Sequence, residues 1–178
     1  MRKVLYIFGQ LTDEDVDWIR KKAEKESVVF GDILIKENEP SDKLYFLIRG
    51  RFSVTSELAG GKELAQLKSG EIIGEMSYLD ALPPSATVTA LEDGVVISID
   101  RELLTEKLEN DFEFSAHFYK ALGVFLSSRL RSTTSMLGYG KDQKLLEDTI
   151  YEDEVDPNVL ENLALAGDRF KRIIDHFS

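Results

Sequence analysis

The 178-residue chain contains no cysteine and only two histidines. Without thiols it can form neither a disulfide framework nor a thiolate metal site. His117 and His176 are isolated in apolar helical stretches, and neither has a second histidine at the spacing of a metal site. No apolar run approaches the length of about 20 residues that crosses a membrane. The sequence therefore predicts no metal, no cofactor and no membrane span.

Short catalytic signatures are also missing. The chain has no Gly-x-Ser-x-Gly elbow, no Walker loop and no His-Glu-x-x-His motif. Neighbouring acids such as Asp13 and Asp15, or residues 152–154, lie in polar stretches where their charges are solvated. These observations argue against an enzyme.

Basic residues are scarce, because 22 lysines and arginines face 33 acidic residues, for a net charge of −11. Such a chain repels DNA and anionic membranes unless it carries a dense basic face, and none is evident. The roughly 40 residues after Leu137 are acidic and too few for a winged DNA-reading module. The apolar run before Gly9 is too short for a signal peptide, which predicts a cytoplasmic protein. We expect no DNA or membrane partner.

Short β-like segments separated by turns occupy the chain from Val28 to Ile99. A helix that Thr12 can cap precedes them. Gly60-Gly61 predicts a hairpin, and Glu92-Asp93-Gly94 predicts a turn between two further strands. Many short strands at this spacing favour a β-sandwich or roll.

Helical periodicity follows Asp100. It predicts a helix over 102–108, a longer one from Phe114 to about Thr134 and, after a linker at 138–141 and an acidic stretch at 147–156, an amphipathic tail starting at Pro157. We expect Gly167-Asp168 to divide the tail into two short helices. Its apolar face must pack on the domain, on a second copy or on a protein partner, and packing on the domain is the commonest outcome. The chain thus divides into residues 1–137 and 138–178.

Residues 70–88 are the most distinctive stretch. Gly74 and Glu75 follow the apolar pair Ile72-Ile73, and Met76–Leu79 can form one helical turn whose first amides lack intrahelical partners. Unpaired amides and the positive end of the dipole favour an anion there. Pro83 and Pro84 end the turn, and alternation resumes at Ser85.

This stretch resembles the phosphate-binding cassette of cyclic-nucleotide-binding domains. The resemblance implies a jelly-roll-like β-roll from about Leu11 to about Leu137, flanked by helices. In that family the Gly-Glu backbone and a Ser or Thr hydroxyl hold the cyclic phosphate, the Glu binds the ribose 2′-hydroxyl, and an Arg after the Pro neutralises the phosphate. The matching positions are Gly74, Glu75, Met76, Ser77, Pro84, Ser85, Ala86 and Thr87.

Pro84 occupies the position of the arginine. Proline removes both the guanidinium and a backbone N–H donor, and a lost charge-assisted hydrogen bond weakens binding by about 1.5–3 kcal/mol. We therefore expect cAMP or cGMP to bind only weakly.

The end of the long helix, Ser128–Thr134, is similar to the base-facing helix of bacterial cAMP-responsive regulators. That likeness implies that Arg129 pairs with Glu75 and that Thr133 and Thr134 meet a purine edge. Alternatively, the two threonines mark a fraying helix end. In the family this helix often forms a dimer seam, which predicts a homodimer through residues 114–134.

Three functions compete. The first is a stand-alone regulatory sensor of a cyclic nucleotide or related small phosphate, with closure of the long helix as the readout. The second is a protein–protein interaction module with the same fold and no nucleotide. The third, a transcription factor, is disfavoured by the acidic C-terminal segment.

Overall fold

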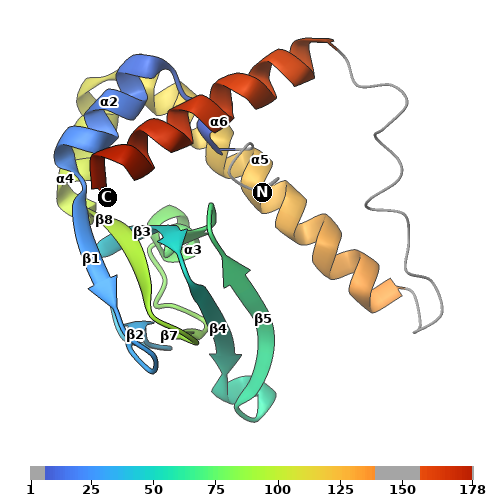
Figure 1. The fold of residues 1–178 in the computed structure, drawn as a ribbon. Coiled ribbons are helices and arrows are strands. Elements are labelled where there is room, and N and C mark those ends of the chain that lie inside the picture. Colours follow the sequence, from blue (N-terminus) through green and yellow to red (C-terminus); the bar gives the residue numbers. More distant parts are fainter. Residues whose placement is uncertain (1–6, 139–156, 178) are drawn as a thin grey trace.

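The computed structural model describes residues 7–138 and 157–177. Two four-stranded antiparallel sheets form a β-roll, and helices cover one side of it (Figure 1). One sheet has the order β1-β8-β3-β6 and the other β2-β7-β4-β5. The strands are β1 Glu24–Val28, β2 Ile33–Ile35, β3 Lys43–Arg49, β4 Arg51–Ser56, β5 Lys62–Lys68, β6 Ile72–Ile73, β7 Thr87–Ala90 and β8 Gly94–Asp100.

The strands enclose a small apolar core inside the roll. Phe52 of β4 is fully buried there, and Leu47 of β3 and Val96 of β8 face it from the other sheet. The expected hairpin joins β4 to β5 through the 3-10 turn η1 Glu57–Ala59 and Gly60-Gly61. Because side chains alternate along each strand, the outer face of the first sheet is left for the helices.

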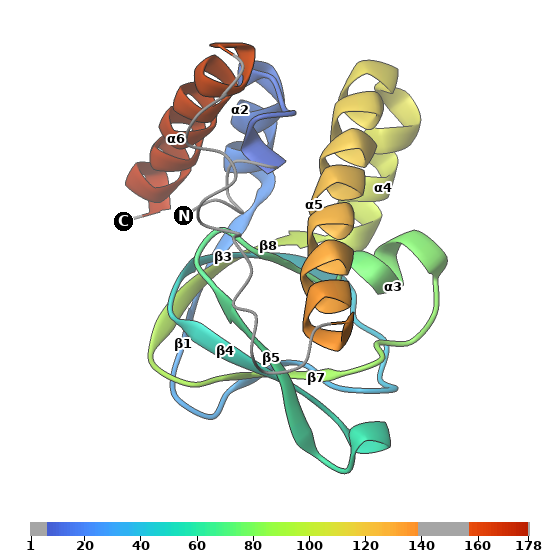
Figure 2. The same cartoon turned by 90° about the vertical axis from the view of Figure 1, so that its right-hand side faces the viewer.

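The helices α2 Asp13–Lys22, α4 Arg101–Asn110, α5 Phe112–Gly138 and α6 Pro157–Phe177 make a second, larger core against that face. Figure 2 shows α2 beside α6, and α4 beside α5. Thr12 caps α2 as predicted, since its side chain accepts the Asp15 N–H and the Asp15 carboxylate accepts the Thr12 N–H. Asp111 separates α4 from α5, at the predicted break.

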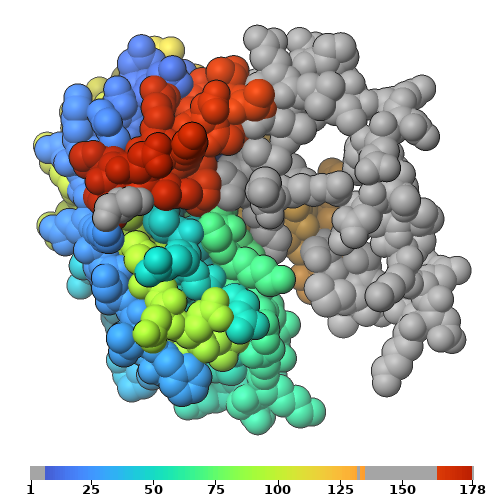
Figure 3. All heavy atoms as spheres, in the orientation of Figure 1, coloured from blue at the N-terminus to red at the C-terminus, as the bar shows by residue number. Residues whose placement is uncertain are grey.

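The tail helix α6 is continuous, so the expected division at Gly167-Asp168 is wrong. Packing explains the continuity, because Ala166 and Ile173 on either side are both fully buried in the helical core. In Figure 3, α6 (red) lies against the blue residues of α2. The prediction that the tail's apolar face packs on the domain is thus confirmed for the residues whose side chains are described.

Ionic contacts add to this docking. Arg169 Nε donates to Asp13 Oδ1 at 2.8 Å, and Arg169 Nη1 donates to the Phe8 carbonyl at 3.1 Å. Arg172 lies 2.8 Å from the same Asp13 oxygen. The predicted linker after Gly138 and the acidic stretch at 147–156 lie outside the described residues. None of the described helices has the length and apolar character of a membrane span.

Candidate functional site

The cassette connects the two sheets. It leaves β6, forms the short helix α3 Glu75–Asp80 and enters β7 at Thr87, as the sequence predicts. Gly74 turns the chain with a φ of +91°. A Cβ at this position would make a tight contact, 3.1 Å from the Lys43 carbonyl oxygen, so the positive φ and the limited space both favour glycine.

Glu75 points into the protein and is 2% exposed. Its carboxylate pairs with Arg129 of α5, the partner that the resemblance implied. Arg129 also lies 3.5 Å from the buried Glu71 carboxylate and packs over the Phe125 ring. One guanidinium is therefore shared by two buried carboxylates, and it joins the cassette to the long helix.

Burial raises the pKa of Glu75, because an ionised carboxylate loses hydration there. Arg129 opposes this effect, whereas the negative charge of Glu71 adds to it. The net direction is upward, so the pair does not fully compensate the cost of burying the Glu75 charge.

Thr87 is half-buried and belongs to a second polar group, around the buried Glu37. Its hydroxyl oxygen accepts the Glu37 N–H at 3.0 Å, so the hydroxyl proton is available for another acceptor. The Glu37 carboxylate accepts Ser56 Oγ–H at 3.0 Å and the Glu57 N–H at 2.7 Å. Sequence reasoning missed Glu37. Its only local signal is an acid two residues after the apolar strand β2.

Pro84 is buried where the cassette ends, and its carbonyl accepts the Asn38 N–H at 2.8 Å. A cleft of about 240 Å³ lies beside it, also lined by Ser77, Asp42 and Arg101. Arg101 Nη2 donates to the Ser77 carbonyl at 2.8 Å, and its guanidinium lies over the Tyr78 ring. Arg101 thus braces α3 from outside, a role with no sequence signal.

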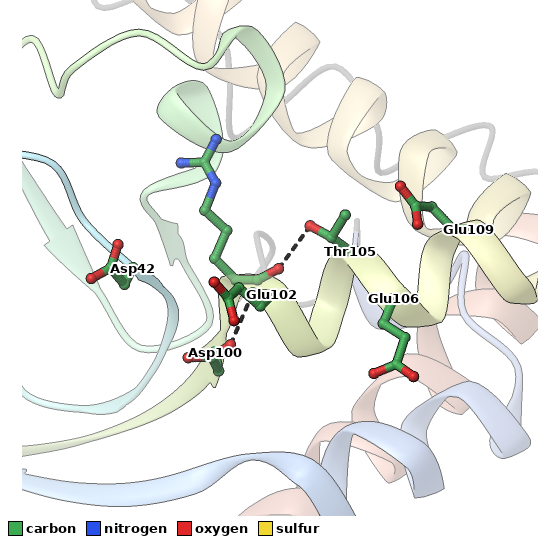
Figure 4. Close-up of a pocket in the computed structure, with 7 residues that line it drawn as sticks. Asp42, Asp100, Glu102, Thr105, Glu106 and Glu109 are labelled. Atoms are coloured by element: carbon green, nitrogen blue, oxygen red, sulfur yellow. Dashed lines mark hydrogen bonds between the residues drawn. The ribbon is translucent and has the colours of Figure 1, made fainter.

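A larger cleft of about 620 Å³ continues along α4. Figure 4 shows acidic side chains from α4 and from the β2–β3 turn around it. This cleft shares Asp42 and Arg101 with the smaller one. Its lining includes none of the predicted site residues: it is formed by Asp42, Asp100, Arg101, Glu102, Thr105, Glu106 and Glu109.

The other predicted site residues are not all brought together. Met76 is 52% exposed, Ser85 is exposed and Ala86 is half-buried. Thr133 and Thr134 are exposed, and their hydroxyls donate to the carbonyls of Arg129 and Leu130. In this conformation the two threonines satisfy their own helix. Contact with a purine remains a prediction.

The isolated histidine of α5 has a structural contact, since His117 Nδ1 lies 2.9 Å from Asp15 Oδ2. Across the described part of the chain, no three His, Asp or Glu side chains form a group that could hold a metal ion.

Comparison with known proteins identifies the domain family that part of this chain matches. Residues 25–111 match the model of the cyclic nucleotide-binding domain. A cGMP-dependent protein kinase of Toxoplasma gondii is 37% identical over 103 residues, which is 58% of this chain and 10% of the kinase. The chain therefore corresponds to a small part of that relative's length.

Solved structures agree on the fold. A cyclic nucleotide-binding domain from Methylobacillus flagellatus KT superposes with a TM-score of 0.69 at 22% identity, covering 80% of this chain and 86% of that one. The N-terminal domain of a transcriptional regulator from Streptomyces coelicolor A3(2) has a TM-score of 0.58 at 29% identity, covering 77% and 99%. With its two-sheet roll and its cassette between β6 and β7, residues 25–111 of this chain form a domain of the cyclic nucleotide-binding family.

Proposed function

We propose that this chain is a regulatory sensor whose cassette, residues 74–87, binds a cyclic nucleotide or a related small ligand. The observation that carries the proposal is the ion pair between Glu75 and Arg129, because it connects the cassette to α5. The family is shared with regulatory regions of larger proteins, and this chain has no catalytic motif. A regulatory role fits both facts, and a cytoplasmic location is part of the proposal.

The readout is a change in the C-terminal half of α5. A ligand hydroxyl that bonds to Glu75 competes with, or reorients, the Arg129 guanidinium. The position of the helix then depends on occupancy of the cassette. A ligand shifts such an equilibrium only by its difference in affinity for the two positions.

Calorimetry with cAMP and with cGMP tests this function. Because Pro84 replaces the phosphate-neutralising arginine, we expect micromolar or weaker affinity, a binding free energy no stronger than about −8 kcal/mol. Glu75→Ala should abolish the binding, whereas Glu92→Ala, which removes an exposed carboxylate paired with Arg51, should leave it unchanged. Nanomolar affinity, or affinity insensitive to Glu75→Ala, would contradict the proposal.

A protein–protein interaction module without a nucleotide is the second candidate. It is favoured by one observation, that Glu75 is already paired inside the protein while Pro84 supplies no cation. No heat signal and no change in melting temperature with either nucleotide would support this candidate.

A homodimer through residues 114–134 is part of the proposal. Phe118, Leu122 and Phe125 are buried in the chain's own core. A dimer seam must therefore use side chains that this core leaves exposed, such as Tyr119 and Leu130, which are 47% and 67% exposed. Light scattering at tens of micromolar should give twice the mass of one chain. A mass equal to one chain would contradict the proposed homodimer.

A further inference from the structure

Arg129 of α5 faces two buried acids, and these acids belong to different parts of the fold. Its Nη1 contacts Glu75 Oε1, and its Nη2 lies 3.5 Å from Glu71 Oε2. Glu75 and Glu71 are 2% and 3% exposed. The two terminal nitrogens of one guanidinium therefore each face a separate carboxylate, and each carboxylate can accept hydrogen bonds from the same cation.

Glu75 is the acid that a ligand engages in the proposed function. It is the first residue of α3 and follows the Gly74 turn of the cassette. A sugar hydroxyl that donates to its carboxylate shares that carboxylate with Arg129. Ligand binding therefore weakens the ion pair that attaches α5 to the cassette.

Glu71 is held by the sheets instead of the cassette. Its carbonyl accepts the Leu47 N–H of β3 at 2.9 Å, and its own N–H donates to the Lys68 carbonyl at 3.2 Å. Its Oε1 accepts the Lys68 N–H at 3.2 Å, while Oε2 is the oxygen nearest Arg129. Leu47 is fully buried in the roll. Neither the backbone of Glu71 nor the position of its carboxylate depends on a residue of the cassette.

The separation of 3.5 Å between Arg129 and Glu71 is slightly longer than a hydrogen bond. Charge-assisted bonds between Arg and a carboxylate are about 2.7–2.9 Å long, so a shift of about 0.6–0.8 Å is enough to form one. The guanidinium carbon of Arg129 lies 4.7 Å from the centroid of the buried Phe125 ring, and so small a shift leaves it beside that ring. Arg129 can thus turn from one acid to the other without passing through an unpaired state, which would be costly in a buried setting.

From this arrangement we propose that Glu71 is a positioning residue, which retains Arg129 when a ligand engages Glu75, so that α5 changes position without detaching. The inference rests on the proposed function, because it concerns the readout of the same site. The C-terminal half of α5 then alternates between two attached positions. Glu71 itself need not touch the ligand.

Hydrogen exchange of the α5 amides at 126–134 tests this retention without any nucleotide, since exchange reports local opening. Glu75→Gln and Glu71→Gln each remove one charge at nearly constant shape. Each single variant should exchange less than about threefold faster than the wild type, because the remaining carboxylate holds Arg129. The double variant should exchange about tenfold faster or more, because both carboxylates that face the guanidinium are gone.

The control pairs Glu75→Gln with Glu92→Gln, which removes a surface carboxylate that contacts Arg51. This double variant should exchange at the rate of Glu75→Gln alone. Circular dichroism establishes that each variant folds. Tenfold faster exchange in either single variant would overturn the inference. So would a Glu75→Gln/Glu71→Gln effect no larger than the product of the two single effects, or one equal to that of the control.

Nucleotide binding connects the retention to the sensor. At saturating cAMP or cGMP, whichever calorimetry shows to bind, the wild-type amides at 126–134 should exchange within about threefold of the free protein. Glu71→Gln should exchange about tenfold faster on binding. An equal response of the two proteins would overturn the inference and leave the sensor function standing. If neither nucleotide binds, the sensor function fails, and the ligand-free variants still decide whether Glu71 retains Arg129.

Discussion

The two halves of α5 are held to the protein in different ways. In the first half, Phe114, Phe118, Leu122 and Phe125 are at most 1% exposed within the helical core. In the second half, described up to Thr134 at the level of side chains, the main attachment is the Arg129 contact with Glu75 and Glu71. Packing fixes the first half whatever the charge at the cassette. The second half depends on charge, and it is the part that a ligand can move.

The first half should respond most strongly to mutation. Phe118→Ala removes a fully buried ring and leaves a cavity, which should lower the free energy of unfolding by about 3–5 kcal/mol. Urea denaturation measures the loss. Tyr119→Ala, at the adjacent half-exposed position, should cost less than about 1.5 kcal/mol. Similar losses in the free energy of unfolding for both variants would contradict the view that packing fixes the first half of α5.

The second half should respond to pH through Glu75. Because burial raises its pKa, the folded protein keeps this proton at pH values where the unfolded chain has lost it. The contribution of Glu75 to the free energy of unfolding therefore falls as pH rises from about 4.5 through the raised pKa.

A Glu75→Gln variant isolates this effect. Urea denaturation of both proteins between pH 4.5 and 7 measures it. The free energy of unfolding of the wild type should contain a fall with rising pH that is absent from Glu75→Gln. Glu92→Gln, on the surface, serves as the control and should keep the wild-type dependence. An identical pH dependence in the wild type and Glu75→Gln would mean that charge does not govern this half.

The smallest effect is expected at the end of α5. Thr133→Ala and Thr134→Ala should each change the free energy of unfolding by no more than about 0.5 kcal/mol, because both side chains are exposed and bond only to their own helix. Affinity for cAMP or cGMP should also stay unchanged. A fivefold loss of affinity in either variant would show that the threonines reach the ligand.

Local sequence signals predicted the parts of the fold that local chemistry decides. Gly74 and the Pro83-Pro84 pair bound the cassette through backbone conformation alone. The sequence did not predict the first four residues of strand β1, Glu24–Val28. They are polar and mostly exposed, and the strand lies at the edge of a sheet. Apolar alternation cannot reveal such a strand.

Prediction of the candidate site depended on the family resemblance more than prediction of the fold did. The Glu75–Arg129 pair joins residues 54 apart in the chain, and no periodicity brings them together. Glu37 becomes meaningful only once Thr87, 50 residues away, lies beside it. Arg101 starts a helix, and its hydrogen bond to the Ser77 carbonyl follows from how α4 packs on α3.

The contact of α6 with the start of the chain has a practical consequence for anyone who dissects this protein. The ring of Phe170 lies 5.5 Å from that of Phe8, and Arg169 bonds to the carbonyl of the same residue. A fragment that keeps the opening segment but ends at residue 111, or just after α5, would expose the surface that α6 covers. Such a fragment would expose apolar surface to other molecules. Its aggregation would therefore not measure the stability of the β-roll.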